Sequence, residues 1–245
     1  MDLRLQDKVV LVTGAGSQTG YGRAIALAFA KEGCHLVLVD VDREGIEGLA
    51  AEIKALGRSA VAARADVTDR EQVASAVEKA LRSLGRIDVL VNNAGASSPL
   101  RPFAEMSRSD WDLDIQVNLY GQMNMAQAVL PHMMARRYGR IINVSGGQGI
   151  PNISVYGAAK AGVEAFTRAL AKEVFPWGIV VNCVAPGLGA TGLTAKAPPE
   201  FMAAYVEGSP LKRLCTGEDV APVVLFLASD VCSYMVGQVI RMGGS

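Results

Sequence analysis

The sequence predicts an α/β fold in which helices cover both faces of one doubly wound parallel sheet. Short β-branched runs alternate with longer helical patterns along the whole chain, as expected for βαβ units with right-handed crossovers. Several of the runs are apolar at consecutive positions, which indicates strands that are buried on both faces. No internal repeat or interdomain linker interrupts the alternation, so residues 1–245 are expected to form a single domain.

The expected elements follow one another in strict order. The strands are the short β-branched runs, and the helices are the longer stretches between them. We expect strands at 8–13, 35–40, 59–65, 87–92, 139–145, 179–184 and 236–241, and helices near 20–32, 43–56, 69–84, 110–136, 154–174 and 217–228.

The composition excludes several classes of protein. Half of the 245 residues are hydrophobic and 20% are charged, which supplies a large core and argues against disorder. The 24 Lys and Arg residues balance 24 Asp and Glu residues, so no basic face for nucleic acid is expected. The longest apolar runs, such as 220–228, are too short to span a membrane, and the N-terminus lacks the pattern of a signal peptide. We therefore expect a soluble, cytoplasmic protein with neither a nucleic-acid nor a membrane partner.

The four cysteines and two histidines do not predict a metal site. The cysteines are far apart, and none forms a C-x-x-C pair. Small or apolar neighbours surround them, so buried reduced thiols are expected.

The turn after the first expected strand is rich in glycine, with Gly14, Gly20 and Gly22 around Tyr21. Glycine lets backbone N–H groups approach a pyrophosphate at the positive end of the following helix. The next strand ends in Asp40, twenty residues after Gly20, which is the spacing of a carboxylate that binds the adenosine ribose hydroxyls. These features predict a Rossmann-type dinucleotide site; the alternative is a plain tight turn beside a surface aspartate.

The position of Asp40 also predicts which dinucleotide is bound. A carboxylate there would repel the 2′-phosphate of NADP, so NAD is the expected cofactor. Arg43 lies nearby and weakens this repulsion, and a reductase that prefers NADPH is the alternative.

Five further motifs appear in order along the chain. They are Asp66-Val67, Asn92-Asn93-Ala94-Gly95, Asn118 within Val117–Gly121, Tyr156-x-x-x-Lys160, and Pro186-Gly187 followed by Thr191. Together they resemble the motifs of the short-chain dehydrogenase/reductase family, and the resemblance covers nearly the whole chain.

The resemblance implies a role for each motif. The cofactor site would comprise the glycine-rich turn and Asp40, the adenine-contacting Asp66 and Val67, the pocket-lining Asn93, Ala94 and Gly95, and the nicotinamide-side Pro186, Gly187 and Thr191. The implied catalytic residues are Asn118, Ser145, Tyr156 and Lys160, and both Tyr156 and Lys160 would also contact the cofactor.

Tyr156 and Lys160 have a physical basis for acid–base chemistry. Their i, i+4 spacing places them on one face of a helix. A free phenol, with a pKa of about 10, is a poor base at neutral pH. An ammonium near 4 Å contributes about 4 kcal/mol at an effective dielectric near 20, so we expect Lys160 to lower the pKa of Tyr156 by roughly three units. Tyr156 would then exchange a proton with the substrate, Lys160 would hold the nicotinamide ribose, and Asn118 would position a water.

Two positions depart from the family's pattern. Gln18 and Thr19 lengthen the glycine-rich turn, which changes the pyrophosphate contacts in detail. Ser145 lies eleven residues before Tyr156, closer than the family's catalytic serine, and Gly146 occupies the usual place of that serine. Ser145 can act as the donor to the substrate oxygen only if the shortened loop turns it inward.

A loop-rich stretch at 188–212 breaks the strand–helix alternation. Prolines and glycines occur there among Leu193, Phe201, Met202 and Tyr205. We interpret the stretch as a substrate lid at the carboxyl edge of the sheet, where open α/β folds bind ligands. The alternative is a surface connection with a short helix.

The sequence therefore predicts an NAD-dependent dehydrogenase that interconverts a secondary alcohol and its ketone. By resemblance, a homotetramer packed through the helices at 110–136 and 154–174 is expected. The two departures keep an alternative open, in which the chain is a catalytically impaired subunit and serves as the structural partner in a hetero-oligomer.

Overall fold

The computed structural model describes residues 2–192, 194 and 197–243. Leu193, one of the apolar residues of the expected lid, lies outside the described residues. All seven strands pair in parallel, in the order β3-β2-β1-β4-β5-β6-β7. The strands are β1 (Val9–Thr13), β2 (His35–Asp40), β3 (Ala60–Arg64), β4 (Val89–Asn92), β5 (Gly139–Val144), β6 (Ile179–Ala185) and β7 (Val239–Arg241).

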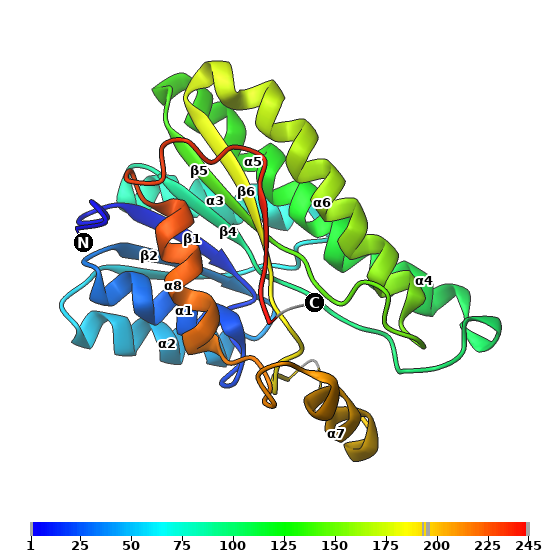
Figure 1. The fold of residues 1–245 in the computed structure, drawn as a ribbon. Coiled ribbons are helices and arrows are strands. Elements are labelled where there is room, and N and C mark those ends of the chain that lie inside the picture. Colours follow the sequence, from blue (N-terminus) through cyan, green and yellow to red (C-terminus); the bar gives the residue numbers. More distant parts are fainter. Residues whose placement is uncertain (1, 193, 195–196, 244–245) are drawn as a thin grey trace.

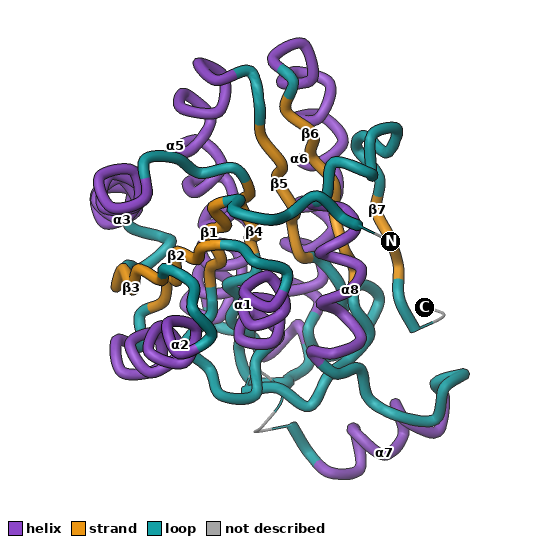
Figure 2. The backbone as a smooth tube through the Cα atoms, turned by 90° about the vertical axis from the view of Figure 1, so that its left-hand side faces the viewer, coloured by secondary structure: helices purple, strands orange, loops and turns teal. Residues whose placement is uncertain are grey.

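Helices cover both faces of this sheet (Figures 1 and 2). One face carries α1 (Tyr21–Lys31), α2 (Arg43–Ala55) and α8 (Gly217–Ala228), and the other carries α3 (Arg70–Leu84), α5 (Gly121–Arg136) and α6 (Ser154–Val174). α4 (Arg108–Ile115) precedes α5, and α7 (Pro199–Gly208) stands apart from the sheet. The expected Rossmann-type, doubly wound α/β fold is confirmed.

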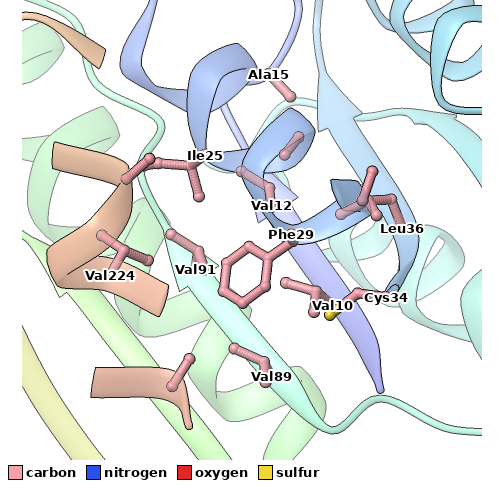
Figure 3. Packing of buried hydrophobic residues seen from close by; sticks show 14 of the residues in the cluster. Val10, Val12, Ala15, Ile25, Phe29, Cys34, Leu36, Val89, Val91 and Val224 are labelled. Carbon is pink, nitrogen blue, oxygen red and sulfur yellow. The ribbon is translucent and has the colours of Figure 1, made fainter. Parts of the chain in front are cut away.

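Each face of the sheet has its own apolar core, because successive side chains of a strand point in opposite directions. Val10 and Val12 of β1 pack with Phe29 of α1 in the first core (Figure 3). Val9 and Leu11 of the same strand belong to the second core. All four valine and leucine side chains are buried, which explains why the strand reads as a continuous apolar run rather than an alternating one.

The helix expected at 110–136 is interrupted. α4 ends at Ile115, a π-helical turn follows at Gln116–Tyr120, and α5 begins at Gly121. A π-turn keeps the backbone helical while it rotates the residues that follow, so the apolar spacing on either side hides the interruption in the sequence. Asn118, an expected site residue, lies in this turn.

In the described part of the stretch expected to form a lid, the chain forms the helix α7. The described residues also form 3₁₀ turns at Phe103–Glu105 and Phe175–Trp177. Among the described residues, no helix combines the length and the apolar character needed to cross a membrane.

Candidate active site

The candidate site begins where β1 and β4 end side by side, at the point where the strand order reverses. The hydroxyl oxygen of Thr13 accepts the N–H groups of Asn93 and Ala94, at 3.0 and 2.9 Å. The Asn93 side chain donates to the carbonyl oxygens of Thr13 and Gly14, at 2.9 and 3.1 Å. Gly14 has φ of +69°, and a Cβ there would lie 2.7 Å from the Ala94 Cα. Only glycine allows the two turns to approach this closely.

The first helix presents free N–H groups beside this junction. Gly20 is the N-cap of α1 but supplies no side-chain cap, and the first turn, which starts with Tyr21 and Gly22, contains no acidic residue. Uncapped N–H groups at the positive end of a helix dipole form a ready site for an anion. The first turn of α1 therefore fits the pyrophosphate of a dinucleotide.

Asp40 ends β2 on the same edge of the sheet. Its two carboxylate oxygens accept the N–H groups of Gly16, at 2.8 Å, and Asp42, at 3.0 Å. A carboxylate has about four acceptor positions, so both oxygens can still accept from ribose hydroxyls. Asp42 is the N-cap of α2 and accepts the Gly45 N–H. Two carboxylates thus lie where the sequence predicts one.

The turn after β3 lies at the same edge of the sheet. The Asp66 carboxylate accepts the N–H and the hydroxyl of Thr68, at 2.9 and 2.8 Å. Val67 is buried, and its carbonyl accepts the side chain of Asn124 at 2.9 Å. The Asp66 N–H donates to the side-chain oxygen of Gln72 at 3.1 Å. Together these bonds fix the conformation of the turn.

Lys160 and Asn118 both lie close to Gly95. A Cβ built at Gly95 would lie 2.9 Å from Asn118 Oδ1 and 3.7 Å from Lys160 Nζ. Asn118 Oδ1 is buried and has no hydrogen-bond partner among the described residues. Lys160 is also buried, and its Nζ donates to the Val144 carbonyl at 3.0 Å. An unpartnered acceptor beside a buried ammonium fits bound hydroxyl groups or water, such as those of a ribose.

Burial shifts the pKa values of Tyr156 and Lys160 in opposite directions. Lys160 loses hydration, and its pKa falls to about 8. Burial raises the pKa of the Tyr156 phenol above its ordinary value, and the nearby Asp114 raises it further. Lys160 Nζ lies 5.6 Å from the centre of the Tyr156 ring. The net direction for the protein's own groups is therefore the opposite of the one expected from Lys160, because burial disfavours the charged phenolate.

Ser145 is engaged in a buried cluster around Glu164. Its hydroxyl contacts the Lys160 carbonyl and the Glu164 carboxylate, both at 3.1 Å. Gln148 also donates to Glu164, and Arg241 of β7 reaches the same carboxylate at 2.7 Å. The hydroxyl of Ser145 is thus committed to α6, and its role toward a substrate stays a prediction.

Gly147 brings the loop after β5 against Tyr156. It has φ of +71°, and a Cβ there would lie 2.7 Å from Cε1 of the tyrosine ring. The main chain therefore forms one wall beside the phenol, where a side chain would displace the ring.

The segment after β6 connects the glycine-rich turn to α7. The Gly187 carbonyl accepts the Tyr21 hydroxyl at 3.1 Å, and the Leu188 N–H donates to the Tyr205 hydroxyl at 2.9 Å. Pro186 precedes this segment, and the Thr191 N–H donates to the Gly189 carbonyl at 3.0 Å. Pro186, Gly187 and Thr191 thus lie on a strand-end segment shared by the turn and the expected lid.

Sequence reasoning missed two buried carboxylates near the site, Asp114 and Glu164. Each lies on a helix, where an acid normally indicates an exposed face. The spacing of apolar residues along these helices does not show that the acid is buried. The i−4 spacing of Asp114 from Asn118 is the signal that was available. Within the described residues, no group of three or more His, Cys, Asp or Glu side chains is arranged to hold a metal ion.

Comparison with known proteins agrees with this geometry. The family model described as enoyl-(acyl carrier protein) reductase matches residues 14–244. The chain is 43% identical over 245 residues to the 3-oxoacyl-(acyl-carrier-protein) reductase FabG of Thermotoga maritima, which covers 99% of this chain and 98% of the relative. It is 39% identical over 241 residues to the cis-4-hydroxycyclohexanecarboxylate dehydrogenase of Sinomonas cyclohexanicum, with coverage of 97% and 96%.

A solved structure is similar along its whole length. A 7α-hydroxysteroid dehydrogenase in complex with NADH and 7-oxo glycochenodeoxycholic acid superposes with a TM-score of 0.93 at 31% identity, covering 100% of this chain and 96% of that chain. The fold and the relatives together define an oxidoreductase that uses a nicotinamide cofactor. The chain belongs to the short-chain dehydrogenase/reductase family, so the resemblance expected from the motifs is confirmed.

The depressed pKa of Lys160 predicts a cost in stability. The folded pKa is about 8 and the ordinary value is 10.5, so the folded state bears the full cost below pH 8. The cost declines between these values, because there the unfolded state binds more protons. Val144 O also accepts from Gln122 at 2.9 Å and stays satisfied without the lysine. We expect Lys160→Met to raise the free energy of unfolding by about 1–3 kcal/mol at pH 7 and by less at pH 9.5.

Urea denaturation at the two pH values measures this difference. The matched control is Lys172→Met, which changes an exposed lysine of the same helix and should leave stability nearly unchanged. An advantage of Lys160→Met that is absent at pH 7, or that does not depend on pH, would contradict the prediction.

Proposed function

We propose that this protein is an NAD-dependent oxidoreductase that transfers a hydride between the cofactor and a secondary alcohol or ketone. The observation that carries the proposal is that three side chains come together near Gly95. They are Lys160, the Tyr156 ring next to it, and Asn118, whose buried Oδ1 has no hydrogen-bond partner among the described residues. These three side chains can hold and move a proton beside a bound substrate.

Each of the chain's own groups has a separate role in the proposed reaction. A bound nicotinamide supplies or accepts the hydride, and its oxidised form adds positive charge. Tyr156 gives its proton to the ketone oxygen in reduction and takes the alcohol proton in oxidation. Lys160 donates to the ribose hydroxyls, and Asn118 accepts from a water that replaces the proton on Tyr156. The turn from Gly14 to Gly22 binds the pyrophosphate.

Two carboxylates support NAD as the cofactor. Asp40 and Asp42 both lie against Gly16, and a Cβ at Gly16 would approach each of them within 3.0 Å. A 2′-phosphate placed there would meet two negative charges. The similar 7α-hydroxysteroid dehydrogenase is complexed with NADH, which agrees with this choice. A preference for NADPH is the alternative that binding measurements decide.

We further propose that the substrate has an apolar or ring-bearing group beside its carbonyl. Ile150, Pro151 and Ile153 follow β5, and Phe201 and Met202 lie on α7, within the segment 188–212 that we propose as a lid. The two named dehydrogenase relatives act on a hydroxycyclohexane and on a hydroxysteroid, which supports a cyclic substrate class.

A homo-oligomer, in keeping with the family's tetramers, is the proposed assembly. Phe103, Leu113 and Tyr120 are large exposed side chains on or beside α4 and the π-turn, where the sequence predicts subunit contacts.

The four cysteines are free thiols, which supports a reducing, cytoplasmic location.

The second candidate function is a catalytically impaired subunit in a hetero-oligomer. The engagement of Ser145 with Glu164 and Lys160 favours it, because a site without the serine donor binds the substrate oxygen less well. Retention of Tyr156, Lys160 and Asn118 favours the active enzyme.

Removal of the Tyr156 hydroxyl tests the proposed mechanism. We expect Tyr156→Phe to lower kcat by about 10²–10⁴-fold while NADH binding, measured by calorimetry, stays near that of the parent. Tyr234→Phe is the control, since Tyr234 is 99% exposed. Unchanged turnover in Tyr156→Phe would refute the assignment, and absence of binding of both NADH and NADPH to the parent protein would favour the impaired subunit.

Removal of the negative charge of Asp40 tests whether the protein prefers NAD over NADP. Asp40→Asn keeps one acceptor oxygen but removes the negative charge, and Asp40→Ala removes both. We expect the dissociation constant for NADH to rise by roughly 10-fold or more in Asp40→Ala, and the preference for NADH over NADPH to fall in both variants. Glu47→Gln, an exposed change on α2, should alter neither; equal selectivity in all four proteins would contradict the ribose assignment.

Substitution of Ser145 distinguishes two roles for its hydroxyl: a hydrogen-bond donor to the substrate oxygen, as in the family, or an anchor to α6. Its hydroxyl contacts α6, so we expect Ser145→Ala to change kcat by about threefold or less, whereas loss of an oxyanion donor costs about 10²–10³. Steady-state rates with one ketone give the answer. A loss of a hundredfold would establish Ser145 as the donor.

A further inference from the structure

Helix α4 has one buried residue, and that residue is an acid. Asp114 is 0% exposed, whereas every other residue of this fully described helix is partly or fully exposed. A surface helix normally buries apolar side chains, because an ionised carboxylate loses its hydration on burial. Asp114 therefore needs specific partners that stabilise it.

Those partners are on the segment that follows Gly95. One oxygen of the Asp114 carboxylate accepts the Ser98 N–H at 2.8 Å, and the other accepts the Ser98 hydroxyl at 2.9 Å. Ser98 is itself 2% exposed. Among the described residues, Asp114 forms no ion pair, and its charged neighbour Asp110 has the same sign. Hydrogen bonds, rather than a cation, hold the negative charge in place.

The same segment is fixed at a second point. The Asn118 side chain donates to the Ala96 carbonyl at 2.6 Å and to the Asp114 carbonyl at 2.8 Å. Ala96 and Ser98 are thus both tied to the junction of α4 and the π-turn. The segment begins directly after Gly95, to which Asn118 Oδ1 and Lys160 Nζ are close.

Asp114 also lies near Tyr156, close enough to its backbone amide for a hydrogen bond. Its charge raises the pKa of Tyr156, after the larger effect of burial, and the backbone amide of Tyr156 stabilises the charged carboxylate in return. Three titratable groups face Tyr156 among the described residues: Asp114 on α4, Lys160 on α6 and Tyr21 on α1. Asp114 is the one acid among them; burial raises its own pKa, and the hydrogen bonds from Ser98 oppose that rise.

We propose that Asp114 is a positioning residue, which fixes the substrate-facing segment Ala96–Ser98 and holds a negative charge beside Tyr156. The inference rests on the proposed function and deepens it. The charge opposes ionisation of the phenol and keeps the proton on Tyr156, in the form that donates to a ketone oxygen. Oxidation of the alcohol, which needs the ionised phenol, then shifts to higher pH.

Two neutral replacements separate charge from anchoring. Asp114→Asn and Asp114→Ser both remove the charge, so each should move the midpoint of the pH profile of kcat/KM for alcohol oxidation to lower pH by about one unit or less. Asp114→Glu keeps the charge and should keep the midpoint. Ser98→Ala removes one anchoring bond and should raise KM for the ketone without moving the midpoint. Asp112→Asn, an exposed change on the same helix, is the control.

Because Asp114→Asn and Asp114→Ser both remove the charge, the test remains possible if one of the two variants fails to fold. A midpoint that stays at the parent's value in whichever neutral variant folds would overturn the electrostatic part. Hydrogen exchange at the Ser98 amide provides a readout that does not need turnover: it should accelerate in Asp114→Ser and not in Asp112→Asn. Unchanged exchange would overturn the anchoring part. Absence of turnover in the parent with every alcohol and ketone would instead refute the proposed function.

Discussion

The hydrogen bonds between the ends of β1 and β4 are the constraint on which the rest of the site depends. At this point the crossover helices leave for opposite faces of the sheet, so the two turns diverge and a crevice opens between them. Thr13 and Asn93 fill the crevice's base and satisfy backbone groups that divergence would leave unpaired. Because both turns are fixed to one another, the N-terminus of α1 and the segment after Gly95 keep a constant separation.

The polar groups buried around that crevice lower the free energy of unfolding. Three buried polar groups lie near the carboxyl ends of β4 and β5: Lys160, the amide oxygen of Asn118, and Asp114. Among the described residues, Asn118 Oδ1 has no hydrogen-bond partner and Asp114 has no ion-pair partner. Each of these groups lowers the free energy of unfolding relative to an apolar replacement. The two apolar cores on either side of the sheet offset that loss, and Phe29 lies at the centre of one of them (Figure 3). The buried polar groups are thus placed beside the well-packed cores that compensate for them.

The sequence predicts the sheet well and the site only in outline. Strands buried on both faces, such as β1, are recognised by their continuous apolar runs, and the motif residues Asn118, Tyr156 and Lys160 follow from the resemblance to the family's motifs. The π-turn escapes prediction because its neighbours keep helical spacing. The direction of the Ser145 hydroxyl and the pKa of Tyr156 escape it for another reason. The hydroxyl direction depends on the buried Glu164, and the pKa of Tyr156 depends on burial of the phenol and then on Asp114. Burial is a tertiary property that no local pattern encodes.

The opposite pKa shifts of Tyr156 and Lys160 indicate how the proposed reaction is controlled. Burial favours the neutral form of both groups: the phenol keeps its proton, and Lys160, with a pKa of about 8, is close to losing one. At neutral pH the pair is a protonated phenol beside an ammonium, which can donate a proton to a ketone oxygen but offers no ionised phenol to accept one. Added positive charge from an oxidised nicotinamide would favour the phenolate. Under the proposed function, the ability of Tyr156 to act as a base is therefore coupled to the bound cofactor, and the protein alone favours reduction.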